Sequence, residues 1–305
     1  FGTLEGDRIL REIGRAVSED MAQVGGIAGR ISGDNFAVLI PAKEKELSIN
    51  RLVQQNRMAF SDKQAVVFSI GRYVVTDPAL PASALYDRAY IAKLSIKGRY
   101  DEHIAYFGDA MLERLIRGQQ IIADMDTAIA ERQFEVWFQP QRNHATGALV
   151  GAEALVRWRH PQRGMISPGE FIPLFEQNGF IYELDKYVWE EACRCLRKWM
   201  DEGRKPLPLS VNISRYDIFR TDFIETLTGT VKQYGVPAEL LRLEITESAF
   251  AESTKRIVEI VRVLIARGFT IEIDDFGSGY SSLNTLKYVP AQVVKLDMRF
   301  LEDDD

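Results

Sequence analysis

Short apolar segments that alternate with helical segments constrain the fold of this chain more than any other feature. The strand-like segments lie at 134–140, 149–156, 207–213, 240–245, 269–273 and 292–296, and the helical segments lie at 168–177, 183–202, 221–234 and 253–267. Strand followed by helix, repeated, is typical of a parallel sheet covered by helices. This number of repeats predicts an α/β fold of the TIM-like (β/α)8 barrel type.

The length of 305 residues predicts two domains, because about 150 residues form a typical domain. The first, at 1–108, reads as a small α/β domain. Its elements are helices at 6–21, 47–60 and 81–97, a hairpin at 27–40, and strands at 65–75 and 103–107. Helical periodicity continues over 109–133, so we expect a semi-rigid linker helix before a second domain at 134–305.

The net charge and the two cysteines limit which binding partners and which cellular location we expect for the protein. The net charge of −6 repels a phosphate backbone, so we do not expect a nucleic-acid polymer as partner. No apolar run approaches the roughly 20 residues of a membrane span, although absent N-terminal segments could tether the protein to a membrane. Cys193 and Cys195 point to different sides of a predicted helix, which favours reduced thiols and a cytoplasmic location. Since the chain starts at Phe1 without a Met, we expect a longer parent protein.

One polar side chain in each of five strand-like segments takes the face opposite its apolar neighbours. These residues are Glu153, Asn212, Glu244, Asp274 and Lys295. Because the carboxyl ends of barrel strands meet at one rim, we expect these side chains to converge there. The alternative is that each acid is an ordinary rim or salt-bridge residue.

The chemistry of this set indicates a metal site. Three carboxylates and an amide, without His or Cys, suit Mg²⁺ or Mn²⁺ better than zinc. Asp275 follows Asp274 and could bridge to a second ion, with a hydroxide between two metals about 3.5–4 Å apart. Lys295 could position that water or neutralise charge on a transferring phosphoryl group.

Two further features point to a phosphate-containing ligand. Arg157 can donate two hydrogen bonds to a phosphate, and the alternative is that it forms an ion pair on the surface. The segment at 275–283, DFGSGYSSL, permits close backbone approach to a ligand. Trp137 and Trp158 read as packing residues, with a place at the barrel mouth as the alternative.

Residues 134–305 resemble the EAL domain, the family of cyclic di-GMP phosphodiesterases. The resemblance is carried by the triplet Glu153-Ala154-Leu155 and by FQPQ, SVNIS, LEITES and IDDFGSGYSSL, which begin at residues 138, 210, 243 and 273. It implies hydrolysis of cyclic di-GMP to linear pGpG by a two-metal-activated water, with Mg²⁺ or Mn²⁺ as cofactor. It also implies an antiparallel first strand.

The resemblance assigns roles residue by residue. It implies that the metal ligands are Glu153, Asn212, Glu244, Asp274 and Asp275. It implies that Lys295 orients the water and that Glu247 steadies the loop at 275–283, which makes these two catalytic residues with Glu153 and Asp275. It implies that the nucleotide is held by Gln139, Leu155 and Arg157. The family's last βα units, with a further metal-binding Glu and a ligand-contacting Gln, would lie beyond Asp305, so we expect this chain alone not to complete the site.

Residues 1–108 resemble the GGDEF domain, the cyclase counterpart. Where that family reads Gly-Gly-Asp/Glu-Glu-Phe, this chain reads Ser32-Gly33-Asp34-Asn35-Phe36, and the family's opening strand with its metal-binding Asp is missing. Ser where the backbone must approach GTP, and Asn where a carboxylate is needed, argue against diguanylate cyclase activity. We expect a degenerate regulatory domain, with residual GTP binding as an alternative.

The leading hypothesis is therefore a bacterial-type signalling phosphodiesterase, expected to be a homodimer. A second hypothesis is a catalytically silent receptor that binds cyclic di-GMP without turnover. A third is an interaction scaffold with neither activity. The paired Asp274 and Asp275 together with Lys295 favour the enzyme, because a receptor has no need of all three.

Overall fold

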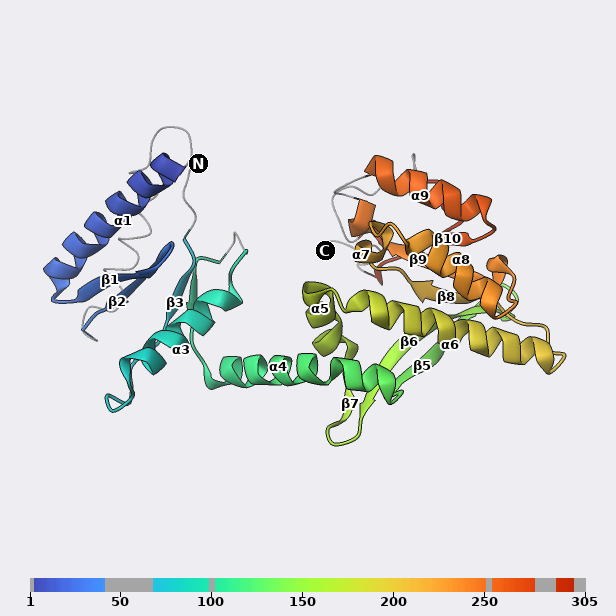
Figure 1. The fold of residues 1–305 in the computed structure, drawn as a ribbon, viewed down its shortest axis with the longest axis horizontal. Helices are drawn as coiled ribbons and strands as arrows, with labels where there is room; N and C mark the ends of the chain where they lie inside the picture. The colour runs from blue at the N-terminus through green and yellow to red at the C-terminus, as the bar shows by residue number, and fades with distance from the viewer. Residues whose placement is uncertain (1–2, 42–67, 99–101, 251–253, 278–288, 299–305) are drawn as a thin grey trace. The chain divides into compact units, whose positions relative to one another are not determined.

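The computed structural model describes residues 3–41, 68–98, 102–250, 254–277 and 289–298 of the chain (Figure 1). Its contacts divide into two compact units, at 1–117 and 118–305. We describe each unit by itself. Among the helices of these residues, none combines the length and the apolar character needed to cross a bilayer.

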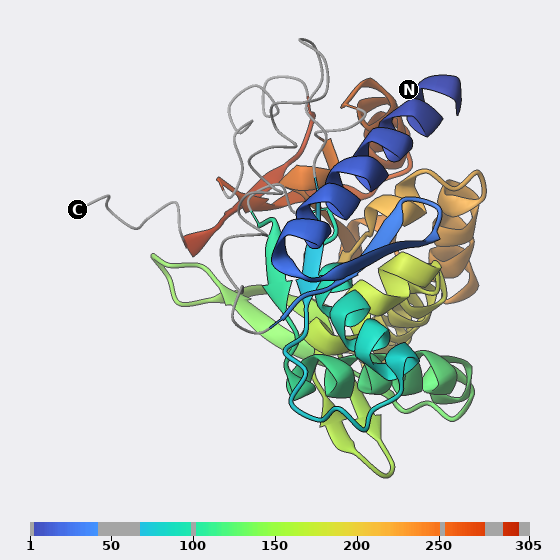
Figure 2. The ribbon, with the colours of Figure 1, turned by 90° about the vertical axis from the view of Figure 1, so that its left-hand side faces the viewer.

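The first unit packs one long amphipathic helix on a hairpin. Helix α1 (Thr3–Val24) lies along strands β1 (Ile27–Ser32) and β2 (Asn35–Leu39), which pair antiparallel (Figures 1 and 2). The buried face of α1 carries Ile9, Ile13, Val17 and Met21 at intervals of one helical turn. The expected helix at 6–21 and hairpin at 27–40 are confirmed.

A second part of this unit pairs two short strands in parallel under a helix. Strand β3 (Ile70–Arg72) pairs with β4 (Ile104–Tyr106), and α3 (Ala82–Ser95) packs on them. A Cβ at Gly71 would lie 1.8 Å from the carbonyl oxygen of Ala89, so only glycine permits this close approach of α3. The expected helix at 47–60 and the start of the strand at 65–75 lie outside the described residues.

Helix α4 (Asp109–Ala130) occupies most of the segment expected to form a linker helix. Its carboxyl-terminal half belongs to the second unit, where Ile121 and Ala128 are buried against Phe134, Trp158 and aromatic side chains of α5. This half is therefore part of a hydrophobic core and is held by packing.

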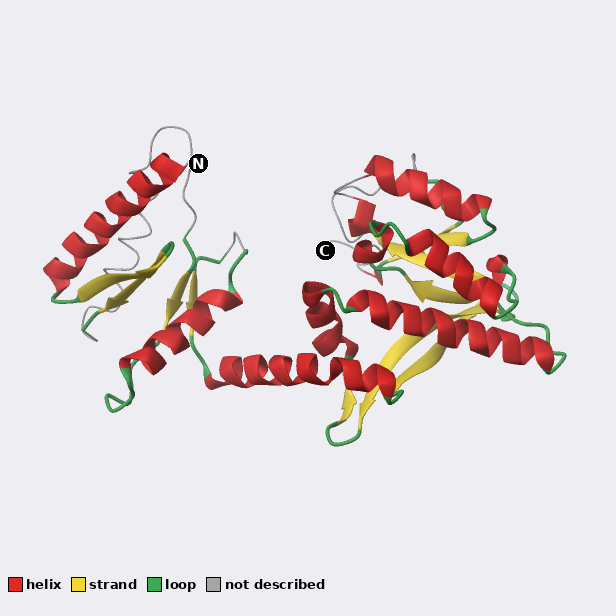
Figure 3. Ribbon diagram, viewed as in Figure 1, coloured by secondary structure: helices red, strands yellow, loops and turns green. Residues whose placement is uncertain are grey.

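The second unit is a twisted sheet with helices on one face (Figure 3). Its strands are β5 (Phe134–Arg142), β6 (Leu149–His160), β7 (Gly164–Ile166), β8 (Leu209–Asn212), β9 (Leu241–Thr246), β10 (Thr270–Phe276) and β11 (Val293–Leu296). Strands β6, β8, β9, β10 and β11 are parallel in that order, and β5 pairs antiparallel with β6. The antiparallel first strand that the resemblance implied is confirmed.

Four of the covering helices match the predicted helical segments, and the short helix α7 (Arg215–Ile218) is an addition that the sequence pattern did not predict. They are α5 (Pro168–Asn178), α6 (Ile181–Asp201), α7 (Arg215–Ile218), α8 (Phe223–Gln233) and α9 (Thr254–Ala266). The apolar members of β8, β9 and β10, such as Leu243 and Ile273, are fully buried among α6, α8 and α9. The opposite face of the same strands carries the polar residues. Cys193 and Cys195 of α6 are unpaired, as expected.

Candidate functional site

Four charged side chains from four strands meet on the polar face of the sheet. The Lys295 Nζ lies 2.8 Å from Glu153 Oε2, 3.0 Å from Glu244 Oε2 and 3.2 Å from Asp274 Oδ1. One carboxylate oxygen of each acid lies within 4.8 Å of the other two. The structure thus brings together residues that are up to 142 positions apart in the sequence.

Strand register explains this convergence. Glu244 of β9 is level with Asn212 of β8, and Asp274 of β10 is level with Thr246 of β9. Paired strands in register point their side chains to the same face at each level, so alternation within each strand places these polar groups together. Asn212 is exposed beside Glu244.

Glu244 is the most buried member of the cluster. Its residue is 1% exposed, and neither carboxylate oxygen has a hydrogen-bond partner among the described residues. Burial, followed by the charge of Glu153, raises the pKa of Glu244 to about 8, although Lys295 opposes this shift. A buried carboxylate whose ion pair is with a lysine shared among three acids is poorly compensated, and a bound cation would stabilise it.

Lys295 is the counter-ion that the chain itself supplies. Burial alone would lower the pKa of its ammonium group, but the hydrogen bond to Glu153 and the charges of Glu244 and Asp274 raise it above the ordinary value. One ammonium faces three carboxylates, so the cluster carries excess negative charge when all are ionised.

The donor set fits a hard divalent cation. It consists of carboxylate oxygens, with the amide of Asn212 at the same level of the sheet, and Mg²⁺ and Mn²⁺ prefer such ligands. Glu244 has no hydrogen-bond partner among the described residues besides its ion pair with Lys295, and a divalent cation among the three carboxylates would add to the charge that one ammonium balances.

Asp275 does not belong to the group of three carboxylates. Its φ is 53°, and the pairing of β10 with β11 shifts register between Ile273 and Phe276. This bulge interrupts the strict alternation that would turn Asp275 to the apolar face. A left-handed φ at a residue with a side chain is a strained conformation of the kind found at functional sites.

Glu247 anchors the segment that follows β10. It is buried in the short helix η3 (Glu247–Phe250), and its Oε2 accepts a hydrogen bond of 2.8 Å from the amide of Gly277. This contact ties Glu247 to the start of the segment at 275–283. The rest of that loop, at 278–283, lies outside the described residues.

The expected nucleotide-binding residues share the polar face of β5 and β6. Gln139 is level with Glu153, and Leu155 is level with Trp137. The Arg157 guanidinium carbon lies 5.9 Å from the centre of the Trp137 ring, and its Nη1 donates to the carbonyl oxygen of Val156. Trp137 is half exposed on this face.

Trp158, by contrast, is fully buried and packs on Phe134 and Phe171. Trp158 is therefore a packing residue, and the alternative hypothesis that it lies at the barrel mouth is wrong.

Sequence reasoning missed a second buried acid. Glu272 is 1% exposed and level with Glu244 on the next strand. Its Oε2 accepts a hydrogen bond of 2.9 Å from Ser210, and its Oε1 lies 3.2 Å from Arg242 Nη1. Alternation could have found it, because it precedes Asp274 by two positions and shares its face.

In the first unit, the hairpin that replaces the family's signature is a tight turn. Ser32 pairs with Asn35 across Gly33, whose φ is 51°, and Asp34. The side-chain oxygen of Asn35 accepts a hydrogen bond from Lys93 of α3. A neutral side chain tied to a lysine thus stands where the cyclase family has a carboxylate.

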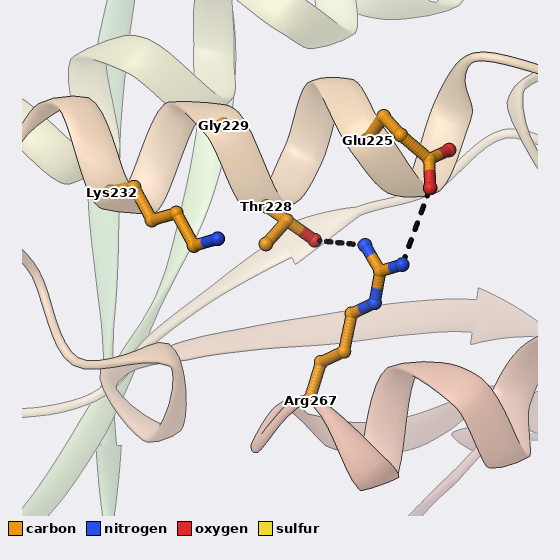
Figure 4. A pocket seen from close by; sticks show the side chains of 5 residues that line it. All are labelled: Glu225, Thr228, Gly229, Lys232 and Arg267. Carbon is orange, nitrogen blue, oxygen red and sulfur yellow. Dashed lines mark hydrogen bonds and ion pairs between the residues drawn. The ribbon is translucent and has the colours of Figure 1, made fainter.

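A surface hollow of about 440 Å³ lies between α8 and the end of α9 (Figure 4). Arg267 donates to Thr228 Oγ1 at 3.0 Å and to Glu225 Oε1 at 3.2 Å, and Gly229 and Lys232 complete the lining. Both helices cover the apolar face of the sheet, so this hollow is separate from the carboxylate cluster.

Two family models match the chain. The EAL domain matches residues 122–305, and the diguanylate cyclase, GGDEF domain matches residues 1–100. The bifunctional diguanylate cyclase/cyclic di-GMP phosphodiesterase MucR of Pseudomonas aeruginosa is 30% identical over 99% of this chain and 45% of its own length.

Two further relatives agree with these matches. The cyclic di-GMP phosphodiesterase NbdA of Pseudomonas aeruginosa is 30% identical over 99% of this chain and 39% of its own length. The solved structure of the PaMucR phosphodiesterase in its c-di-GMP complex has 37% identity and a TM-score of 0.57, over 60% of this chain and 74% of that one. This chain therefore spans less than half the length of these curated relatives.

Proposed function

We propose, from the premise that this chain belongs to the EAL domain family and carries a GGDEF domain before its EAL domain, that it supplies the metal centre for hydrolysis of cyclic di-GMP, which the family's last βα units complete. One phosphodiester bond is opened to give linear pGpG. The observation that carries the proposal is the convergence of Glu153, Glu244 and Asp274 around Lys295. A family resemblance alone does not require these groups to meet, whereas phosphodiester hydrolysis at a metal centre does.

In this proposal the cation is Mg²⁺ or Mn²⁺, and it is held by Glu153, Asn212, Glu244 and Asp274, with Asp275 serving a second ion. When bound, the metal ions polarise the attacking water and the phosphoryl oxygens. The positions of the Glu153 and Glu244 side chains are fixed and largely buried, because both residues belong to strands in the middle of the sheet.

Lys295 has two roles in this proposal. Before a cation binds, its ammonium balances the three carboxylates. With the cation in place, its ammonium orients the water and neutralises charge that develops on the phosphoryl group. Its high pKa keeps it protonated throughout the neutral range, so it acts by charge and by donating hydrogen bonds.

The nucleotide lies along β5 and β6, where Gln139, Leu155 and Arg157 hold it. The guanidinium of Arg157 lies beside the half-exposed ring of Trp137. The guanidinium offers a positive charge for a phosphate, and the ring offers an aromatic face for guanine. Glu247 fixes the start of the loop after β10 through Gly277.

The GGDEF unit is proposed to regulate and not to make cyclic di-GMP. Asn35 replaces a carboxylate and its amide oxygen is occupied by Lys93, which leaves Asp34 as the acid of the hairpin. GTP binding to this unit and homodimer formation belong to the same proposal, as means by which the unit could act on the EAL domain.

The test is pGpG release from cyclic di-GMP, with MnCl₂, by a protein that carries this chain together with the family's last βα units, compared with its Glu153→Ala variant. Turnover that disappears in Glu153→Ala supports the proposal. Tight binding of cyclic di-GMP without product would instead identify a receptor, and neither binding nor product would identify a scaffold. Incubation with GTP, followed by analysis for cyclic di-GMP, tests the regulatory role of the first unit.

A further inference from the structure

The polar face of the sheet holds a second ionic group that hydrolysis does not use. Arg242 of β9 and Glu272 of β10 form an ion pair, and Ser210 of β8 completes it. Arg242 precedes Glu244 by two positions on the same strand, and Glu272 is level with Glu244 on the next strand. A partly buried cation is therefore placed next to the carboxylate that is proposed to bind the metal.

Glu272 and Glu244 differ in the protein partners of their carboxylate oxygens. Each oxygen of Glu272 has a partner from the protein, Arg242 at 3.2 Å and Ser210 at 2.9 Å. Glu244 has an ion pair through Oε2 alone, at 3.0 Å from Lys295 Nζ, and neither of its oxygens has a hydrogen-bond partner among the described residues. Both residues are 1% exposed, so solvent does not account for the difference.

The site of the Arg242 guanidinium is shaped by neighbouring strands. A Cβ at Gly151 would lie 3.0 Å from Gln141 Oε1, 3.1 Å from the carbonyl oxygen of Pro208 and 3.7 Å from Arg242 Nη1. The glycine is needed for the close approach of Gln141 and Pro208, and the Arg242 guanidinium lies at ordinary contact distance from the same position.

We propose that Glu272 is a positioning residue that holds Arg242 away from Glu244 and so keeps the Glu244 carboxylate free for the divalent cation. Residues two apart on a strand lie on one face about 6.5–7 Å apart, which is within the reach of an arginine side chain. If Glu272 carried no charge, Glu244 would be the next carboxylate on the strand of Arg242. The guanidinium would then occupy the ligand, and its charge would repel the cation.

The inference rests on the proposed function, because it assumes that Glu244 binds a cation. Its test is the affinity of the full chain for Mn²⁺, followed by the electron paramagnetic resonance signal of free Mn²⁺. The variants are Glu272→Gln, the double variant Arg242→Met/Glu272→Gln, and Glu225→Gln as a control. The control breaks the Arg267–Glu225 pair, which has the same nitrogen–oxygen distance of 3.2 Å on the outer helices (Figure 4).

We expect Glu272→Gln to weaken Mn²⁺ binding about tenfold or more, because an uncompensated cation adjoins the site. The double variant removes that cation and restores the affinity, while Glu225→Gln leaves it unchanged. If Glu272 only stabilised the fold, the additional substitution of Arg242 would not restore the Mn²⁺ affinity. Thermal melting of each variant verifies that the chain is folded.

Two results overturn the inference while the proposed function stands. One is wild-type affinity in Glu272→Gln, and the other is equal weakening in Glu272→Gln and the double variant. A wild-type chain that binds no Mn²⁺ would overturn the proposed metal site, and this inference with it. The wild-type measurement thus distinguishes the two failures.

Discussion

Replacing Lys295 by Met should destabilise the metal-free protein strongly. The ammonium has three carboxylate oxygens within 3.2 Å, and its own side chain is 26% exposed, against 0% for the side chain of Glu244. Removing one partner of such a buried group costs about 3–5 kcal/mol, and we take about 3 kcal/mol because Glu244 can accept a proton. For a unit of the size of 118–305, a loss of about 1 kcal/mol in stability lowers the melting temperature by about 2–4 °C. The melting temperature in EDTA should therefore fall by about 6–12 °C.

The assay is thermal unfolding followed by circular dichroism, in EDTA and in excess MnCl₂. Binding to the native state alone stabilises a protein according to the ratio of ligand concentration to Kd. Lys295→Met removes a cation that competes for the same oxygens, so Mn²⁺ should raise its melting temperature by more than it raises that of the wild type.

The matched control is Lys186→Met, which breaks an exposed pair with Glu183 at 2.9 Å on α6 and should cost no more than about 1 kcal/mol. If Lys295→Met melts in EDTA at the temperature of Lys186→Met, the counter-ion role of Lys295 is refuted.

Three further predictions concern other groups. Burial raises the pKa values of the carboxyls of Asp185 and Asp217, and the charge of Asp217 raises the pKa of Asp185 further. The folded chain therefore holds protons that the unfolded chain releases, and stability falls as the pH rises above the unfolded pKa values. Asp185→Asn should flatten this decline in urea unfolding curves recorded from pH 5 to 8, and an unchanged slope would contradict the prediction. Since the pKa of Glu244 is about 8, protons compete with the cation below that pH, and the Mn²⁺ affinity of the wild type should rise from pH 6 to 8 and then level off; an affinity independent of pH would be inconsistent with this. Glu247→Ala should lower kcat about 10²-fold without changing Mn²⁺ affinity, because it releases Gly277 but removes no ligand; a parallel loss of both would place Glu247 among the ligands.

The order of the elements was predictable because it depends on local patterns. Alternation at 240–245 and 269–273 assigned Leu243 and Ile273 to one face, and Glu244 and Asp274 to the other, before any partner strand was known. The same pattern located α5, α6, α8 and α9 within a few residues, whereas the short helix α7 was not predicted. Periodicity along one segment is enough for this, since side-chain direction follows from backbone geometry.

What the sequence alone determined, then, is which polar groups face one side of each strand. Which of them meet was decided by the tertiary structure, because the register between strands depends on packing across the whole sheet. That register placed Lys295 among three carboxylates, while Glu272, two positions from Asp274, was drawn to Arg242 and Ser210 instead. It also set Asp185 beside Asp217, a pairing between α6 and α7 that no local pattern carries. Distances between segments far apart in the chain are fixed only when all their apolar faces are buried together.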